Sequence, residues 1–207
     1  MIEIRAFRPG DLYALYRIAL ATGDGGADAA ALYRDPKLVG HIYAGPYAAL
    51  CPETVFVAVD AQGVAGYIVG AADTRVFEAL AEAAWWPHLR TLYPDPVDVP
   101  AEDRTPDQRR CHAIHHPRGT PAGIADSHPS HLHINLLPHL RGQGIGRALM
   151  ERWCDAVRAA GSRGAHLAVG TGNQRAMRFY AAYGFRELTH APRLAPTAVW
   201  LGVTFAT

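Results

Sequence analysis

A glycine-rich segment about two-thirds of the way along the chain has the residue pattern best suited to chemistry. It reads Leu136-Leu137-Pro138-His139-Leu140-Arg141-Gly142-Gln143-Gly144-Ile145-Gly146-Arg147, between an apolar strand pattern and an amphipathic helix pattern. A loop that opens directly into a helix leaves backbone N–H groups unpaired at the positive end of the helix dipole, and such a site binds a phosphate or pyrophosphate. Arg141 and Arg147 add positive charge. The glycine spacing alone does not distinguish this anion site from a simple tight turn.

Two other phosphate-binding loops do not fit this segment. A P-loop ends in Gly-Lys-Ser or Gly-Lys-Thr, whereas Gly146 is followed by Arg147 and Ala148. A dinucleotide-binding fold places its glycines near the start of the domain, with an acidic residue about 20 positions later. The late position of the present loop therefore argues against that fold.

A second pattern follows the loop and narrows the interpretation. It reads Asn173-x-x-Ala176-x-x-Phe179-Tyr180-x-x-x-Gly184-Phe185. In this order, the two patterns resemble motifs A and B of the Gcn5-related N-acetyltransferase (GNAT) family, strongly over residues 130–190 and loosely before them. The resemblance implies an α/β fold of the α+β type, in which a mixed, splayed central sheet flanked by helices grips acetyl-coenzyme A (acetyl-CoA).

Three further segments resemble a narrower group within that superfamily. They are Thr74-Arg75-Val76-Phe77-Glu78, Trp85-Trp86-Pro87 and His131-Leu132-His133-Ile134-Asn135-Leu136-Leu137-Pro138. These segments look like bacterial relatives of the acetyltransferase-like domain of O-GlcNAcase. This closer resemblance leaves the acceptor of the acetyl group open.

The GNAT resemblance implies a set of residues that bind acetyl-CoA. Backbone groups of the strand would pair with the pantetheine arm, and backbone N–H groups of the loop would hold the pyrophosphate. The residues assigned to cofactor binding are Ile134, Leu136, Arg141, Gly142, Gln143, Gly144, Ile145, Gly146, Arg147, Asn173 and Tyr180. Asn173 is equally suited to cap a helix.

Tyr180 is assigned by the same resemblance as the general acid that returns a proton to the coenzyme A thiolate. The pKa of a thiol lies near 8.5 and that of a phenol near 10, so a hydrogen bond from the phenol is enough to stabilise the leaving sulfur. A backbone N–H near Leu136 would hold the oxyanion. A tyrosine on a helix is also commonly a core residue.

The general base is the point at which the sequence departs from the family. Some relatives carry a glutamate on the strand before motif B, where this chain has Ala168. His131, His133 and Asn135 replace it as catalytic candidates, because side chains two residues apart share one face of a strand. Histidine, with a pKa near 6.5, suits proton transfer, but two structural histidines are an equally open interpretation. Asp126 and His128 rank lower.

Residues 72–130 differ in character from the rest of the chain. One apolar helical face, from Phe77 to Trp85, precedes a stretch rich in proline and histidine up to Pro129, which predicts little regular structure. We expect one domain over residues 1–207, with this insertion between the third and fourth strands forming a wall of the acceptor site. A dimer contact or a satellite core remains an alternative, so the sequence leaves a homodimer open.

Histidines gather in this insertion, at Cys111-His112-x-x-His115-His116 and at His128. Zinc sites commonly combine a His pair with a Cys-x-x-Cys pair, and no such cysteine pair occurs in this sequence. A proline-rich loop also often carries histidines. We therefore expect no metal.

The remaining pattern alternates strands with helices, which is typical of α/β and α+β sheets. The predicted strands are 2–8, 54–59, 64–70, 131–137, 165–169, 187–189 and 198–205. The predicted helices are 12–20, a weaker one over 28–38, 77–85, 145–160 and 173–183.

Composition excludes several classes of protein. The 207 residues carry a net charge of +1, which gives no electrostatic footprint for nucleic acid or an acidic membrane surface. No apolar run approaches the roughly 18 residues of a membrane span, and the alternating first residues do not resemble a secretory signal. The cysteines, Cys51, Cys111 and Cys154, are typical of free thiols in a reducing cytoplasm. We expect a cytoplasmic protein with no nucleic-acid or membrane partner.

These observations predict an acetyl-CoA-dependent N-acetyltransferase that modifies a primary amine of a small molecule or peptide. The transfer would proceed by direct attack in a ternary complex. The alternative is an acetyl-CoA-binding pseudo-acetyltransferase without transferase activity. Ala168 and Asn135 favour that alternative, whereas Tyr180, His131 and His133 favour the enzyme.

Overall fold

The computed structural model describes residues 2–189 and 198–205 and is built around one seven-stranded sheet. The strands are β1 (Glu3–Ala6), β2 (Phe56–Asp60), β3 (Gly63–Ala71), β4 (Ser130–Leu136), β5 (Gly164–Gly170), β6 (Arg186–Glu187) and β7 (Ala198–Thr204). Their order across the sheet is β1-β2-β3-β4-β5-β7-β6. Strands β4 and β5 pair in parallel, and the other neighbouring strands among the described residues pair antiparallel. The mixed sheet expected from the sequence is therefore confirmed.

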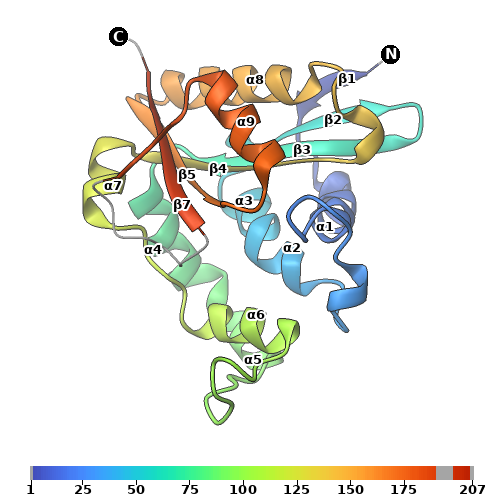
Figure 1. Ribbon diagram of the computed structural model, residues 1–207, viewed down its shortest axis with the longest axis vertical. Helices are drawn as coiled ribbons and strands as arrows, with labels where there is room; N and C mark the ends of the chain where they lie inside the picture. The colour runs from blue at the N-terminus through green and yellow to red at the C-terminus, as the bar shows by residue number, and fades with distance from the viewer. Residues whose placement is uncertain (1, 190–197, 206–207) are drawn as a thin grey trace.

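Helices cover both faces of this sheet (Figure 1). They are α1 (Leu12–Ala21), α2 (Leu38–Tyr43), α3 (Gly45–Leu50), α4 (Thr74–Ala84), α5 (Trp86–Leu92), α6 (Pro106–His115), α7 (Ala122–Ser127), α8 (Ile145–Ala159) and α9 (Gln174–Tyr183). Short 3-10 turns occur at Pro9–Asp11, Ala30–Leu32, Pro52–Thr54 and Pro138–Leu140. Within the described ranges, no helix combines the length and the apolar character that a membrane crossing requires.

Helix α8 lies along one face of the sheet (Figure 1). Its fully buried residues include Leu149, Trp153 and Val157, which follow one another at four-residue intervals and so share one side of the helix. Gly161, with φ of 88°, follows the helix in a left-handed conformation that glycine adopts without strain. The predicted helix over 145–160 is confirmed, and its apolar side contributes to one of two cores.

The second core lies on the opposite face of the sheet, under α1 to α5. Strand β4 separates the two cores because its side chains alternate between faces. Leu132 and Ile134 pack into the α8 core, whereas the His131 ring contacts Tyr47 and Phe77 of the other core. The sequence prediction that His131 and His133 share a face is confirmed by their common contact with Tyr47.

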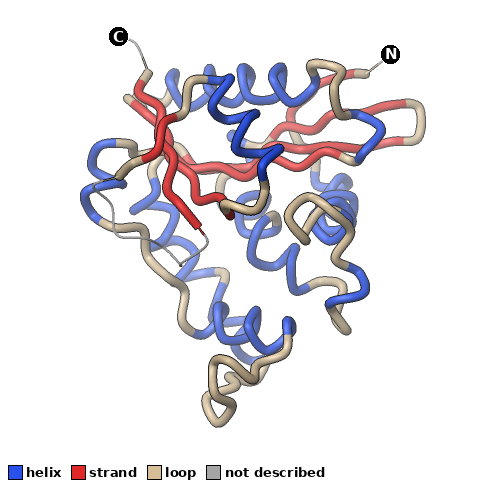
Figure 2. Tube along the Cα trace, viewed as in Figure 1, coloured by secondary structure: helices blue, strands red, loops and turns tan. Residues whose placement is uncertain are grey.

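Helices α4 to α7 are inserted between β3 and β4, as the sequence predicted. The expectation of little regular structure after Pro87 was wrong, because α6 and α7 form there and α5 continues to Leu92. Helix α6 begins with a capping box, in which Thr105 accepts from the Gln108 backbone and the Gln108 side chain accepts in return. Figure 2 shows this helical insertion extending away from the sheet, with a long loop joining α5 to α6.

The predicted helix over 28–38 was also wrong. Only a 3-10 turn forms at Ala30–Leu32, and α2 begins at Leu38. Pro36 disfavours a helical conformation at Asp35, whose side chain instead accepts from the Lys37 backbone ahead of α2. A new helix, α2, therefore begins after Pro36, and no single helix runs through the proline.

Candidate active site

The sheet opens between β4 and β5. These strands pair only at Ser130 with Ala165 and at His131 with His166 among the described residues. Beyond this point β4 continues along β3 up to Leu136, and β5 continues along β7 up to Gly170. The splayed sheet expected from the sequence is therefore present.

One edge of β4 faces this opening with its backbone groups. Leu137 donates its N–H to the Ala65 carbonyl of β3 at 2.9 Å. Because hydrogen bonding alternates along an antiparallel strand, the backbone groups of Leu136 and Ile134 point the other way, toward β5. Consistent with this direction, the Leu136 carbonyl accepts from Arg141 Nε at 3.2 Å. The two strand residues predicted to pair with a pantetheine arm are placed to do so.

The loop after β4 presents backbone N–H groups at the N-terminal end of α8. Among the described residues, no backbone carbonyl accepts from the N–H groups of residues 142–147, whereas Ala148 donates to Gly144. Gly142 and Gly144 have φ of 75° and 77°, and a Cβ at either position would meet nothing within 4 Å. No other residue therefore covers the side of the backbone where a Cβ would lie at Gly142 and Gly144. These features fit the anion site that the sequence predicts.

Gly146 serves a different purpose from the other two glycines. A Cβ on Gly146 would lie 3.3 Å from the Phe179 ring and 3.4 Å from Leu136 Cδ1. The residue therefore allows α8 to pack closely against β4 and α9.

A groove of about 370 Å³ lies beside this loop and is lined by residues 25–27, Arg141 and residues 172–175. Arg141 Nη2 donates to the Gly26 carbonyl at 2.7 Å. The Arg175 guanidinium lies so close to Gly26 that a Cβ there would overlap it. Burial lowers the pKa of Arg141, and the positive charge of Arg175 lowers it further. Within the described part of the chain, neither arginine has a carboxylate in ion-pair range, so the pair favours an anionic ligand.

Arg175 was not among the predicted cofactor residues. Its position, two residues after Asn173 in the first turn of α9, is a sequence signal that would have found it. Asn173 itself caps α9, because its Oδ1 accepts from the Ala176 backbone at 3.1 Å. Arg147 is largely exposed and pairs with Glu151 at 2.9 Å.

Tyr180 lies on α9 with 7% of its surface exposed. Its ring contacts Phe179 and Phe185 edge-on, at centroid distances of 5.3 and 5.5 Å. Burial raises the pKa of the Tyr180 hydroxyl above its usual value, so the group stays protonated at physiological pH. After the helix, Gly184 with φ of 109° turns the chain and Phe185 packs back, as predicted.

His131 has hydrogen-bond partners at both ring nitrogens. Thr74 Oγ1 donates to the Pro129 carbonyl at 2.6 Å, so the same oxygen accepts from the His131 Nδ1–H at 2.8 Å. His131 Nε2 then accepts from the Tyr47 hydroxyl at 2.9 Å. No lone pair remains on the ring for an incoming proton. This arrangement favours the structural interpretation of His131.

His133 is held differently, by ring contacts alone. Its imidazole meets Tyr43 and Tyr47 edge-on at 5.3 and 5.5 Å, and no residue in the described ranges forms a hydrogen bond with it. Burial lowers the pKa of His133 to about 4. The ring is therefore neutral at physiological pH, with one accepting nitrogen and one N–H that form no hydrogen bond to the described residues.

The other predicted catalytic candidates are placed less favourably. The Asn135 amide donates to Thr22 Oγ1, which ties β4 to the end of α1. Ala168 is exposed opposite Trp200 of β7 and offers no acid or base. Asp126 and His128 lie at α7, near the start of β4 and therefore at the other end of that strand from the glycine-rich loop.

Comparison with known proteins agrees with this geometry. A family model described as an acetyltransferase (GNAT) domain matches residues 109–187. The crystal structure of SsHAT is 36% identical, covers 100% of this chain and 99% of its own, and superposes with a TM-score of 0.90. The chain belongs to the GNAT acetyltransferase family. It is therefore an acyl-CoA-dependent acetyltransferase.

Two less similar proteins also match this GNAT protein. A GCN5-related N-acetyltransferase from Kribbella flavida shares the fold, with 18% identity, a TM-score of 0.53 and coverage of 99% and 98% of the two chains. Protein O-GlcNAcase from Rattus norvegicus is 23% identical over 200 residues, which are 96% of this chain and 22% of that protein. The chain thus spans about a fifth of the length of these curated relatives. Its relationship to the acetyltransferase-like domain of O-GlcNAcase, expected from the sequence, is confirmed.

The insertion of this GNAT protein reaches the neighbourhood of His133 through α6. Arg110 donates to the Tyr33 hydroxyl at 2.9 Å and to the Tyr43 hydroxyl at 2.7 Å. Tyr43 in turn contacts the His133 ring. Sequence reasoning missed Arg110, because its partners lie 77 and 67 residues away along the chain.

Proposed function

We propose that this GNAT protein transfers the acetyl group of acetyl-CoA to a primary amine of a small molecule or a peptide. The transfer proceeds by direct attack of the amine on the thioester in a ternary complex. The observation that carries the proposal is the opening between β4 and β5, which leads to the unpaired N–H groups before α8. An extended, hydrogen-bonding arm with a pyrophosphate at one end has the shape and chemistry that such a site accommodates.

The residues that bind acetyl-CoA follow from this arrangement. The backbone of Ile134 and Leu136 pairs with the pantetheine arm, and the N–H groups of residues 142–147 hold the pyrophosphate. Arg141 and Arg175 neutralise phosphate charge from the side of the groove. Asn173 contacts the arm while it caps α9. Phosphate oxygens at a helix N-terminus also gain from the helix dipole.

The reaction needs one proton removed and one proton supplied. The neutral amine forms a C–N bond to the acetyl carbon while a backbone N–H near Leu136 stabilises the oxyanion. The C–S bond then breaks, and Tyr180 donates its phenolic proton to the departing thiolate. His133 accepts a proton from the attacking amine, directly or through water, because its unprotonated ring nitrogen has no hydrogen-bond partner among the described residues. His133 then releases its proton to solvent, and Tyr180 recovers one from solvent.

The insertion supports the acceptor side of this site. Helix α6 places Arg110 against Tyr33 and Tyr43, and Tyr43 packs on His133. We assign residues 72–130 as the wall of the acceptor pocket within a single domain over residues 1–207. We also place the protein in the cytoplasm, on the basis that Cys51, Cys111 and Cys154 are free and buried.

The experiment that tests this proposal measures binding and turnover separately. The purified chain is titrated calorimetrically with acetyl-CoA, and release of coenzyme A thiol is then followed over a panel of alkylamines, amino acids and peptides. We expect saturable binding and thiol release that depends on the amine. Binding without release on any member of the panel would favour a pseudo-acetyltransferase. Absence of binding would contradict the assignment of the cofactor site.

A further inference from the structure

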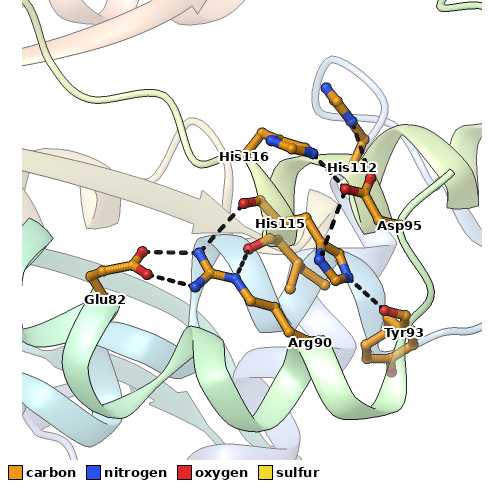
Figure 3. A network of polar contacts seen from close by, with 8 residues as sticks. Glu82, Arg90, Tyr93, Asp95, His112, His115 and His116 are labelled. Carbon is orange, nitrogen blue, oxygen red and sulfur yellow. Dashed lines mark hydrogen bonds and ion pairs between the residues drawn. The ribbon is translucent and has the colours of Figure 1, made fainter. Parts of the chain in front are cut away.

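The insertion contains a second group of side chains suited to chemistry, at the opposite end of the molecule from α8 (Figure 1). Asp95 lies in the loop after α5, and His112 and His116 lie one turn apart at the C-terminal end of α6. Their potential ligand atoms all lie within 4.8 Å of one another. Figure 3 shows the imidazoles gathered around the Asp95 carboxylate.

The distances in this cluster suit a small cation. His116 Nε2 lies 2.5 Å from Asp95 Oδ2, and His112 Nδ1 lies 3.4 Å from Asp95 Oδ1. Around a tetrahedral zinc ion, ligands about 2.0–2.1 Å from the metal lie about 3.3 Å from one another. The observed separations fall on either side of that value. Because the side chains of His112 and His116 are 36% and 51% exposed, they are free to rotate by the small amount required.

A third imidazole faces the same carboxylate. His115 Nε2 lies 2.7 Å from the Tyr93 carbonyl, which only accepts, so the Nε2 atom carries the proton. In the neutral ring, His115 Nδ1 then directs a lone pair at Asp95 Oδ2 from 4.0 Å. A lone pair facing a carboxylate is unfavourable, and either a cation between them or a proton on Nδ1 relieves it. A backbone carbonyl as partner of the remote N–H is also the usual arrangement for a histidine that binds a metal.

The guanidinium in this network is already neutralised by another carboxylate. The guanidinium of Arg90, in the same network, is already paired with Glu82 through two bonds of 2.5 and 2.9 Å. The C-terminal end of α6 adds the negative pole of a helix dipole.

We propose that Asp95, His112 and His116 bind a divalent transition-metal ion of the zinc type. Imidazole nitrogens with one carboxylate favour Zn²⁺ over Mg²⁺ or Ca²⁺, which prefer oxygen ligands. The sequence predicted no metal because no paired cysteines accompany the histidines, and Asp95 precedes His112 by 17 residues. A bound ion links the loop after α5 to α6. Helix α6 also carries Arg110, which donates to the Tyr43 hydroxyl.

The experiment uses the full chain without a polyhistidine tag, stripped with a chelator and titrated calorimetrically with zinc chloride. We expect one ion per chain. Asp95→Asn and His116→Gln should each weaken the affinity by about tenfold or more. The matched control is His88→Gln, which removes an exposed histidine of α5 and should leave the affinity unchanged. Cobalt(II) as a second probe should show visible absorption of a tetrahedral site in the wild type and lose it in His116→Gln.

Thermal unfolding provides a readout that does not depend on the heat of binding. Zinc should raise the Tm of the wild type and of His88→Gln, and should leave that of His116→Gln unchanged. Circular dichroism without metal checks that the variants are folded. The proposal is overturned if the wild type binds no zinc, or if Asp95→Asn and His116→Gln bind it as tightly as His88→Gln.

Discussion

His131 is the last residue of β4 that pairs with β5, and its partner across the sheet is His166. From this pair onward the two strands separate, while each keeps its other neighbour. The separation exposes backbone groups of β4 that an ordinary sheet would pair, and it does so below the N-terminal end of α8. The proposed binding of acetyl-CoA rests on this opening.

The groove arginines give the first prediction. Arg175→Gln should weaken acetyl-CoA binding by about five- to tenfold, equivalent to roughly 1 kcal/mol, because an exposed charge contact to a phosphate is lost. Calorimetric titration measures this change. Arg178→Gln removes the same charge from an exposed position on the same helix and should bind as the wild type does. If both variants lost the same affinity for acetyl-CoA, the effect would come from net charge and the contact assigned to Arg175 would be contradicted.

Tyr180 gives the second prediction. Tyr180→Phe should lower kcat by about 100-fold, since the thiolate loses its proton donor. The Kd for acetyl-CoA should be unchanged, because the ring still packs between Phe179 and Phe185. Tyr183→Phe, three residues later on α9, serves as the control and should keep the wild-type rate. A wild-type kcat in Tyr180→Phe would remove the general-acid role.

The depressed pKa of His133 gives the third prediction. With a pKa of about 4 the ring stays neutral through the assay range, so it adds no inflection near pH 6.5. The rate should instead rise with pH until the acceptor amine has lost its own proton. His133→Phe should reduce kcat/KM by about tenfold at every pH without changing the shape of the profile. An inflection near pH 6.5 that disappears in this variant would contradict the assigned pKa.

Buried histidines also make folding stability depend on pH. Burial lowers the pKa of His133 and of His166 to about 4, and that of His131 well below its usual value. The unfolded chain takes up protons below about pH 6.5, while the folded chain does not. Stability is therefore greatest above pH 6.5 and falls between pH 6.5 and pH 4, by about 1.4 kcal/mol per pH unit for each such histidine.

Urea unfolding at several pH values checks this expectation. His133→Phe keeps the aromatic contacts with Tyr43 and Tyr47 and should reduce the slope by about one histidine's share. His88→Phe, at an exposed position, should leave the slope as it is. If acidification to pH 4 left the unfolding midpoint of the wild type unchanged, the three rings would have to be protonated in the folded state.

Local signals in the sequence were sufficient to predict the helices and strands around the opening between β4 and β5. Gly144 and Gly184 mark the start of α8 and the end of α9, and both adopt the left-handed conformation that favours glycine. Apolar periodicity located α8 and the hairpin of β2 and β3. These elements are long or strongly patterned, so local propensity and tertiary packing agree.

Other elements depend on contacts that the sequence does not display. Helices α2 and α3 have six residues each, too short for a periodic pattern, and are stabilised by core residues such as Leu38 and Tyr47. Helix α6 was missed because its interior is rich in arginine and histidine, although its capping box at Thr105 was readable.

The candidate site likewise contains features that the local sequence predicts and features that depend on contacts between distant residues. The glycine-rich loop is contiguous in the chain and was predicted from it. The bond that occupies His131 comes from Tyr47, 84 residues away, and only the folded structure brings the two together. Residues 190–197, which separate the strands predicted over 187–189 and 198–205, lie outside the described residues.

The most direct test of the central claim compares two glycines of matched geometry. Gly144 and Gly161 have φ of 77° and 88°, and a Cβ at either would meet nothing within 4 Å. Aspartate therefore imposes similar backbone strain at both, but only Gly144 lies at the proposed pyrophosphate site. Calorimetric titration with acetyl-CoA should show binding to Gly161→Asp as to the wild type, and a loss of about 100-fold or more in Gly144→Asp, equivalent to roughly 3 kcal/mol. Equal affinity of the two variants would contradict the assignment of this loop to acetyl-CoA.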